Sequence, residues 1–228
     1  MKNEKIKSDK VKIENKGKFY TLGEEIFNAV SHGVGALLSI AALVLLVVAA
    51  VIGKGSASAI VSAVIYGVSL IVLYTSSTLY HALTNETAKK VFRIFDHSSI
   101  FILIAGTYTP IALVILKDTN LGIILFSVLW TLTVLGIILN SLSIEKFKVI
   151  SMLLYVGMGW AAVLAAKPLW ENVVLPGIIL LVIGGIAYTG GLTFYGLKKF
   201  KYMHSIWHLF VLAGSVLHFL CIILFVYN

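Results

Sequence analysis

Two histidines, four positions apart, begin the last long apolar stretch of the chain. His204 and His208 belong to the segment Lys201-Tyr-Met-His-Ser-Ile-Trp-His208. On a helix this spacing places both imidazoles on one face, about 6 Å apart along the axis. Two neutral imidazoles presented in this way form a common half-site for zinc. The structural alternative is that one histidine caps the helix and the other anchors it at a membrane interface.

Three more side chains complete a set that can do chemistry. Ser77 and His81 close an earlier apolar stretch, and Asp96 opens the next one. A third imidazole beside the pair would leave one open metal position, which is typical of a catalytic zinc site rather than a closed structural one. Asp96 would then serve as a base, and Ser77, on the same helix face as His81, would bond a ligand or substrate.

The elements that position these residues are predicted to be membrane helices. The chain has 228 residues, of which 59% are hydrophobic and only 12% are charged. This excludes an ordinary soluble domain and predicts a multi-pass membrane protein. The net charge of +8 lies in a tail and short loops, which indicates membrane topology and not nucleic-acid binding. The single Cys221 excludes an intrachain disulfide, and the charged first 25 residues do not resemble a cleavable signal peptide.

The apolar pattern predicts an all-α protein with one transmembrane domain. Residues 1–21 form a basic cytoplasmic tail, and residues 22–228 form a seven-helix transmembrane domain that begins at a Thr21–Glu24 capping box. Each apolar span is long enough to cross a hydrocarbon core of about 30 Å. The seven predicted spans are 26–52, 58–82, 94–116, 121–139, 149–166, 173–195 and 203–226.

The distribution of lysine and arginine predicts how these spans are oriented. Fifteen of them fall in the tail and in the loops after the second, fourth and sixth spans, and three fall in the other loops. The N-terminus is therefore expected in the cytoplasm and the C-terminus outside. With this topology, His81, Asp96, His204 and His208 all lie at the cytoplasmic face. Asp96 is the one charged residue within the spans, so it should have a partner.

Each of these residues also has a structural interpretation. His81 and Asp96 could form a buried ion pair without a metal, and Ser77 could bond its own backbone. His97 should point about 100° away from Asp96, toward the interface or behind the site. His32, in a glycine-rich segment, is expected to pack at a helix crossing. His218 lies about 21 Å deeper than His204, so it cannot share their metal.

Four sequence blocks together resemble the hemolysin III family, the bacterial branch of the progestin and adipoQ receptor group within a ceramidase-like superfamily. They are Glu24-Glu-Ile-Phe-Asn-Ala-Val-Ser-His-Gly-Val-Gly35, Ser77-x-x-x-His81, the segment from Asp96 to Pro110 and His204-x-x-x-His208. The resemblance implies seven helices in a bacterial plasma membrane and Zn²⁺ bound by His81, His204 and His208. It also implies a water held toward Asp96 and a link to membrane-fluidity homeostasis.

Four functions are compatible with these features to different degrees. The first is a zinc-dependent hydrolase of a lipid amide or ester, with Asp96 and Ser77 as catalytic residues and membrane lipids or free fatty acids as ligands. The second is a non-enzymatic sensor of membrane state with structural zinc. A cytolysin is disfavoured because no row of charges could line a pore, and an ion transporter because the spans hold one charge.

Overall fold

The computed structural model describes residues 20–197 and 200–227, and within these ranges the chain is helical with no β-strand. The predicted basic tail lies outside the described residues except for Tyr20 and Thr21. The α-helices are α2 (Leu22–Ala49), α3 (Ala57–Ala82), α4 (Glu86–Pro110), α5 (Asn120–Gly159), α6 (Ala166–Asn172), α7 (Leu175–Gly196) and α8 (Met203–Phe225). Short irregular helical turns follow three of them, at η1 (Ala50–Lys54), η2 (Ile111–Ile115) and η3 (Ala161–Ala165).

Short polar side chains set where the helices begin. The predicted capping box is confirmed: Thr21 Oγ1 accepts from the Glu24 backbone N–H, and the Glu24 carboxylate accepts from Thr21 N–H at 2.8 Å. Asn85 caps α4 in the same way, so α4 begins earlier than the predicted span at 94. Lys89 and Arg93, expected in a loop, therefore lie on the first turns of α4.

The described helices are those of a multi-pass membrane protein, as predicted. Six segments are long and apolar enough to cross a membrane. Many of their apolar side chains face outward, as Leu37 and Leu142 do with about 70% of their surface exposed. The six segments are Leu22–Lys54, Ala57–Ala82, Glu86–Ile115, Asn120–Asn172, Leu175–Gly196 and Met203–Phe225.

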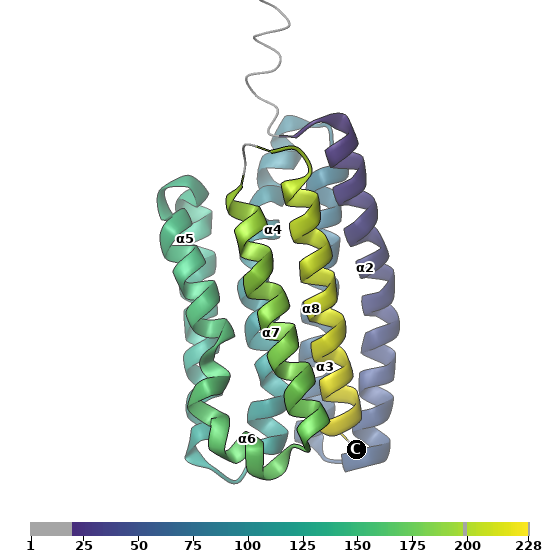
Figure 1. The fold of residues 1–228 in the computed structure, drawn as a ribbon, viewed down its shortest axis with the longest axis vertical. Helices are drawn as coiled ribbons and strands as arrows, with labels where there is room; N and C mark the ends of the chain where they lie inside the picture. The colour runs from purple at the N-terminus through teal and green to yellow at the C-terminus, as the bar shows by residue number, and fades with distance from the viewer. Residues whose placement is uncertain (1–19, 198–199, 228) are drawn as a thin grey trace, which may run out of the picture.

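The longest segment folds back on itself at Ser143. This residue has an extended backbone (φ −170°, ψ 112°) inside α5. Ser151 Oγ donates to Asn140 Oδ1 at 3.0 Å, whereas an unbroken helix would separate these residues by about 16 Å. Ser143 Oγ caps the returning half by accepting from Lys146 N–H. The expected loop between residues 139 and 149 is thus a tight helical hairpin, visible where α5 turns in Figure 1.

The helices form one bundle in which α2, α3 and α8 enclose one apolar core, while α4 and the α5 hairpin enclose another. The α2–α3 contact is close because Gly67 lacks a side chain: a Cβ there would lie 2.9 Å from Leu43 Cα. At the end of the bundle that carries His81 and His204, Arg93 pairs with Glu145 at 2.5 Å. Lys148 lies over the Tyr195 ring at 5.1 Å. Basic residues expected in the loops after the second and fourth spans therefore lie at this end.

Candidate metal centre

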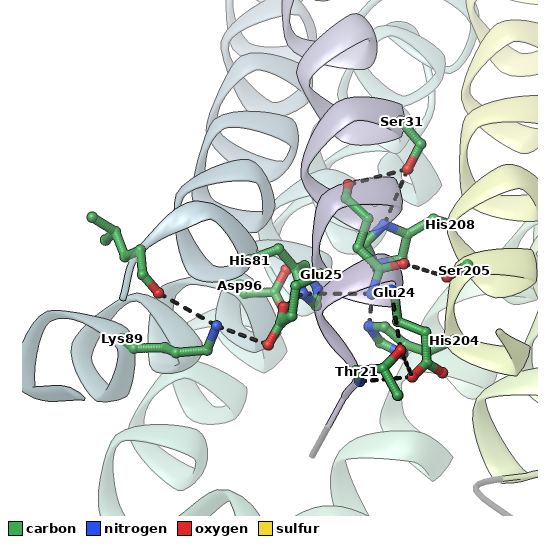
Figure 2. Close-up of polar contacts among 12 residues, drawn as sticks. Thr21, Glu24, Glu25, Ser31, His81, Lys89, Asp96, His204, Ser205 and His208 are labelled. Atoms are coloured by element: carbon green, nitrogen blue, oxygen red, sulfur yellow. Dashed lines mark hydrogen bonds and ion pairs between the residues drawn. The ribbon is translucent and has the colours of Figure 1, made fainter. Parts of the chain in front are cut away.

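Three imidazoles meet at one end of the bundle. His81 lies in the last turn of α3, while His204 and His208 lie in the first turns of α8. One ring nitrogen from each can be chosen so that all three atoms lie within 4.8 Å of one another. His204 Nε2 and His208 Nε2 are 3.1 Å apart. Figure 2 shows His81 from α3 facing the α8 histidines. The structure thus brings together the three histidines predicted from the sequence.

The first turns of α2 hold the start of α8 in place. Glu24 Oε1 accepts from the Tyr202 backbone N–H at 2.8 Å, and Tyr202 has a positive φ of 62°. Ser205 Oγ donates to Asn28 Oδ1 at 2.6 Å. These bonds fix the direction of the helix that carries His204, and nothing in the sequence pattern pointed to them.

Glu25 orients the imidazole of His81. The Glu25 Oε2 atom lies 2.6 Å from His81 Nδ1, and Glu25 Oε1 lies 2.9 Å from Lys89 Nζ (Figure 2). A carboxylate accepts only, so Nδ1 donates and Nε2 carries the lone pair. His81 Nε2 is buried and has no hydrogen-bond partner among the described residues. A metal ion is the partner that such an atom, beside two other imidazole nitrogens, is suited to bind.

Asp96 lies beside the three histidines without joining them. Its side chain is 14% exposed, and Oδ2 lies 3.4 Å from His97 Nδ1. The expectation that His97 points away from Asp96 is therefore wrong, since the two side chains bend toward each other. Ser77 is 1% exposed, and its hydroxyl has no hydrogen-bond partner of ordinary geometry, although it interacts electrostatically with the Asp96 carboxylate.

Two aromatic rings cover α8 histidines. His32 stacks on His208, with ring centroids 3.6 Å apart, so it flanks the site as well as packing at a helix crossing. Tyr20 stacks on His204 at 4.8 Å. Burial raises the pKa of the Tyr20 phenol well above its usual value, so this ring stays neutral. His218 is not part of the histidine group, as the depth argument predicted.

Two adjoining cavities lead away from the metal centre. The inner one, with an empty volume of about 520 Å³, is lined by Asp96, His97, His204 and His32 among others. The outer one, of about 720 Å³, has mostly apolar and aromatic lining from α3, α4, α5, α7 and α8. The cavities share the lining residues Leu73, Ile100, Tyr155, Leu192, Trp207 and Val211. The two cavities therefore adjoin, with histidines and Asp96 lining the inner one and mostly apolar side chains lining the outer one.

The fold and the site define a helical multi-pass membrane protein with a buried three-histidine centre. The chain belongs to the Haemolysin-III related family, which it matches over residues 20–219. It is 46% identical to hemolysin-3 of Bacillus cereus over 203 residues, covering 89% of this chain and 92% of that protein. It is also 46% identical to the hemolysin-3 homolog of Bacillus subtilis over 206 residues, with 90% and 96% covered. The human monocyte to macrophage differentiation factor is 28% identical over 179 residues, with 74% and 71% covered.

Proposed function

We propose that this protein binds zinc through His81, His204 and His208 and hydrolyses an amide or ester bond of a membrane lipid. The observation that carries the proposal is the adjacency of the two cavities: His204 and Asp96 line a cavity that shares six lining residues with a larger apolar one. A long acyl chain suits the apolar part, and its polar linkage would then lie at the histidines.

The donor set favours a transition metal such as zinc over calcium or magnesium. Three imidazole nitrogens without thiolates suit zinc, whereas calcium and magnesium prefer oxygen ligands. The three ligands leave a fourth position, and Asp96 is not among the grouped ligands. Zinc held by three imidazoles supplies Lewis acidity that lowers the pKa of water toward about 7.

Three residues of this chain have separate roles in the proposed hydrolysis. The Asp96 carboxylate accepts the proton of the attacking water and returns it to the leaving group. The Ser77 hydroxyl, which has no hydrogen-bond partner of ordinary geometry among the described residues and interacts with the Asp96 carboxylate, donates a hydrogen bond to the oxygen that gains charge in the reaction. Tyr20 covers His204, and this cover limits the entry of bulk water from that side.

The same proposal includes seven crossings with a cytoplasmic N-terminus. The segment from Asn120 to Asn172 is too long for one crossing and reverses at Ser143, so its halves are assigned as two antiparallel spans. The gathering of basic residues at the histidine end supports a cytoplasmic metal centre.

A second candidate function is a non-enzymatic sensor of membrane state. It is favoured by the origin of the ligands: His81 comes from α3 and the other two from α8, which are far apart in the sequence. A metal would then act as a clamp between them, with no chemistry.

Mass spectrometry of lipids decides between the two functions. Ceramides, acyl amides and phospholipids are incubated with wild type, Asp96→Asn and zinc-stripped protein. The hydrolase proposal predicts product with wild type only, a loss of about a hundredfold or more in Asp96→Asn, and unchanged zinc content in that variant. Absence of product across the panel with zinc fully bound would contradict the hydrolase and leave the sensor.

A further inference from the structure

One residue of the glycine-containing segment His32-Gly-Val-Gly35 contacts a proposed metal ligand directly. His32 of α2 is 3% exposed, and its ring stacks on that of His208 of α8, with 3.6 Å between the ring centroids and 13° between the planes. Neither ring nitrogen of His32 has a hydrogen-bond partner of ordinary geometry among the described residues, although the ring interacts with the His208 backbone carbonyl. The proposed hydrolysis does not use this buried imidazole.

The grouped histidines are not held equally firmly. His81 Nδ1 has a carboxylate oxygen at 2.6 Å. His208 Nδ1 has weaker contacts, because it lies 3.5 Å from Ser31 Oγ (Figure 2) and interacts with the Asn28 backbone carbonyl without the geometry of an ordinary hydrogen bond. A contact of that length restrains a ring far less than a short charge-assisted hydrogen bond does. The parallel stack on His32 therefore does most to fix the plane of the His208 ring.

Tyr74 of α3 holds His32 in turn. The Tyr74 ring is buried and meets His32 edge to face with centroids 5.0 Å apart, and its hydroxyl donates to Ser215 Oγ at 2.7 Å. This ring lies directly against the backbone of α2 at Gly35, where a Cβ would stand only 2.7 Å from Tyr74 Cε1. A supporting stack thus runs from Gly35 through Tyr74 and His32 to His208.

Metal binding strengthens the contact between the two imidazoles. Two neutral rings stacked face to face attract each other weakly, because their electron-rich faces oppose. A metal cation bound to His208 withdraws electron density from its ring, and the face of His32 then attracts it in the way that an aromatic face attracts a cation. The stack therefore favours the metal-bound centre over the empty one.

We propose that His32 is a positioning residue for the metal centre: its ring, supported by Tyr74, holds the His208 imidazole in the orientation that binds the metal. The inference rests on the proposed zinc binding and is independent of the hydrolysis. It gives the His32-Gly-Val-Gly35 segment a function, in which His32 makes the contact and Gly35 leaves room for Tyr74.

Substitution of His32 tests the contribution of its ring. Zinc affinity of the purified full chain in detergent is measured by competition with a chromogenic chelator. His32→Leu keeps most of the bulk but removes the aromatic face, so it should lower the affinity by about tenfold. His32→Phe keeps the face and should restore most of the affinity.

Gly35→Ala tests the supporting stack without altering any of the grouped ligands. The added methyl group displaces the Tyr74 ring and should lower zinc affinity by up to about tenfold. Gly67→Ala is the matched control, because its Cβ would overpack the same α2–α3 pair, 2.9 Å from Leu43 Cα, without touching Tyr74. It should lower the midpoint of thermal unfolding of the metal-free protein and leave zinc affinity unchanged.

The outcomes separate this inference from the proposed function. Equal affinity in wild type and His32→Leu, or an equal loss in His32→Leu and His32→Phe, would overturn the role of the His32 ring while leaving zinc binding intact. Equal losses in Gly35→Ala and Gly67→Ala would show that loosening of the α2–α3 contact, and not the stack, lowers affinity. If Gly35→Ala does not fold, the two His32 variants still decide.

Failure of the proposed function itself would look different. Wild-type protein that binds no zinc would contradict the metal centre as a whole. A loss of affinity in His32→Leu with recovery in His32→Phe, in a protein that hydrolyses no lipid, would support the positioning role and contradict the hydrolase.

Discussion

At the scale of single residues, the chemistry of the centre depends on groups that do not themselves belong to the histidine set. Glu25 contacts His81 Nδ1 at 2.6 Å and also pairs with Lys89. The first contact fixes the tautomer that leaves His81 Nε2 available, while the second joins α2 to α4. These two roles predict different effects of substitution.

Removal of the Glu25 carboxylate should weaken metal binding. Glu25→Ala is expected to lower zinc affinity by about 10- to 100-fold, because His81 loses the partner that orients it. Glu25→Gln should fall between alanine and wild type, since its amide oxygen still accepts from Nδ1 without the charge. Competition with a chromogenic chelator measures the affinity. Lys89→Met is the matched control, because it breaks the ion pair and leaves the His81 contact; an equal loss in both variants would show that Glu25 only ties helices together.

Sequence spacing was sufficient to identify the three histidines but not their supporting residues. His204 and His208 are one helical turn apart, so helical periodicity puts them on one face. His81 lies at the end of a predicted span, and the predicted topology puts that end on the same side of the membrane. In the sequence, Glu25 looks like any acidic residue in the first turn of a helix, here α2. Its contact with His81 depends on how α2 docks on α3, which no local pattern specifies. Asp96 and His97 differ from the expectation because adjacent side chains on a helix can still meet: His97 Nδ1 lies 3.4 Å from Asp96 Oδ2 and 3.0 Å from the Arg93 carbonyl oxygen.

At the scale of elements, the helices approach one another most closely where glycine faces a neighbouring backbone. Gly67 on α3 lies against Leu43 of α2, and this crossing places the end of α3 that carries His81. Gly33 on α2 faces α3 but has more room, because a Cβ there would meet Thr78 no closer than 3.7 Å.

The two glycines should therefore respond differently to the same substitution. Gly67→Ala is expected to lower the free energy of unfolding by about 1–3 kcal/mol, because the added methyl group overpacks the α2–α3 contact. Gly33→Ala should leave stability unchanged or raise it slightly, since alanine favours the helix. Thermal unfolding in detergent compares them. Equal midpoints for the two variants would show that the close approach at Gly67 can relax without penalty.

The spans were predictable from apolar runs, and so was a break between residues 139 and 149, whereas the tight helical form of the α5 turn was not. The last span was expected at 203–226, and α8 runs over Met203–Phe225. The turn at Ser143 contains neither glycine nor proline, which are the usual signals for a break. A single extended serine that caps the returning helix is a weak local signal. The bond from Ser151 to Asn140 joins the two halves, and Tyr155 of the returning half packs on Phe101 of α4.

At the scale of the whole molecule, the arrangement of charge predicts how the protein sits in its membrane. The α5 turn and the start of α4 are joined by the Arg93–Glu145 pair, so both are expected on the same, cytoplasmic side. A reporter that is active only outside the membrane should be active after Asn228 and inactive when inserted at the Ser143 turn. The reverse pattern, or the same activity at both places, would contradict the seven-crossing topology.

The most direct test of the account is elemental analysis of metal in protein purified without chelators. We expect about one zinc per chain in the wild type, because three imidazoles converge and His81 Nε2 has no hydrogen-bond partner among the described residues. His204→Ala and His208→Ala should each lose most of this zinc, whereas His218→Gln, about 15 Å from His208, should retain it. Wild-type protein without zinc, or an equal loss of zinc in all three variants, would contradict the assignment of the metal centre.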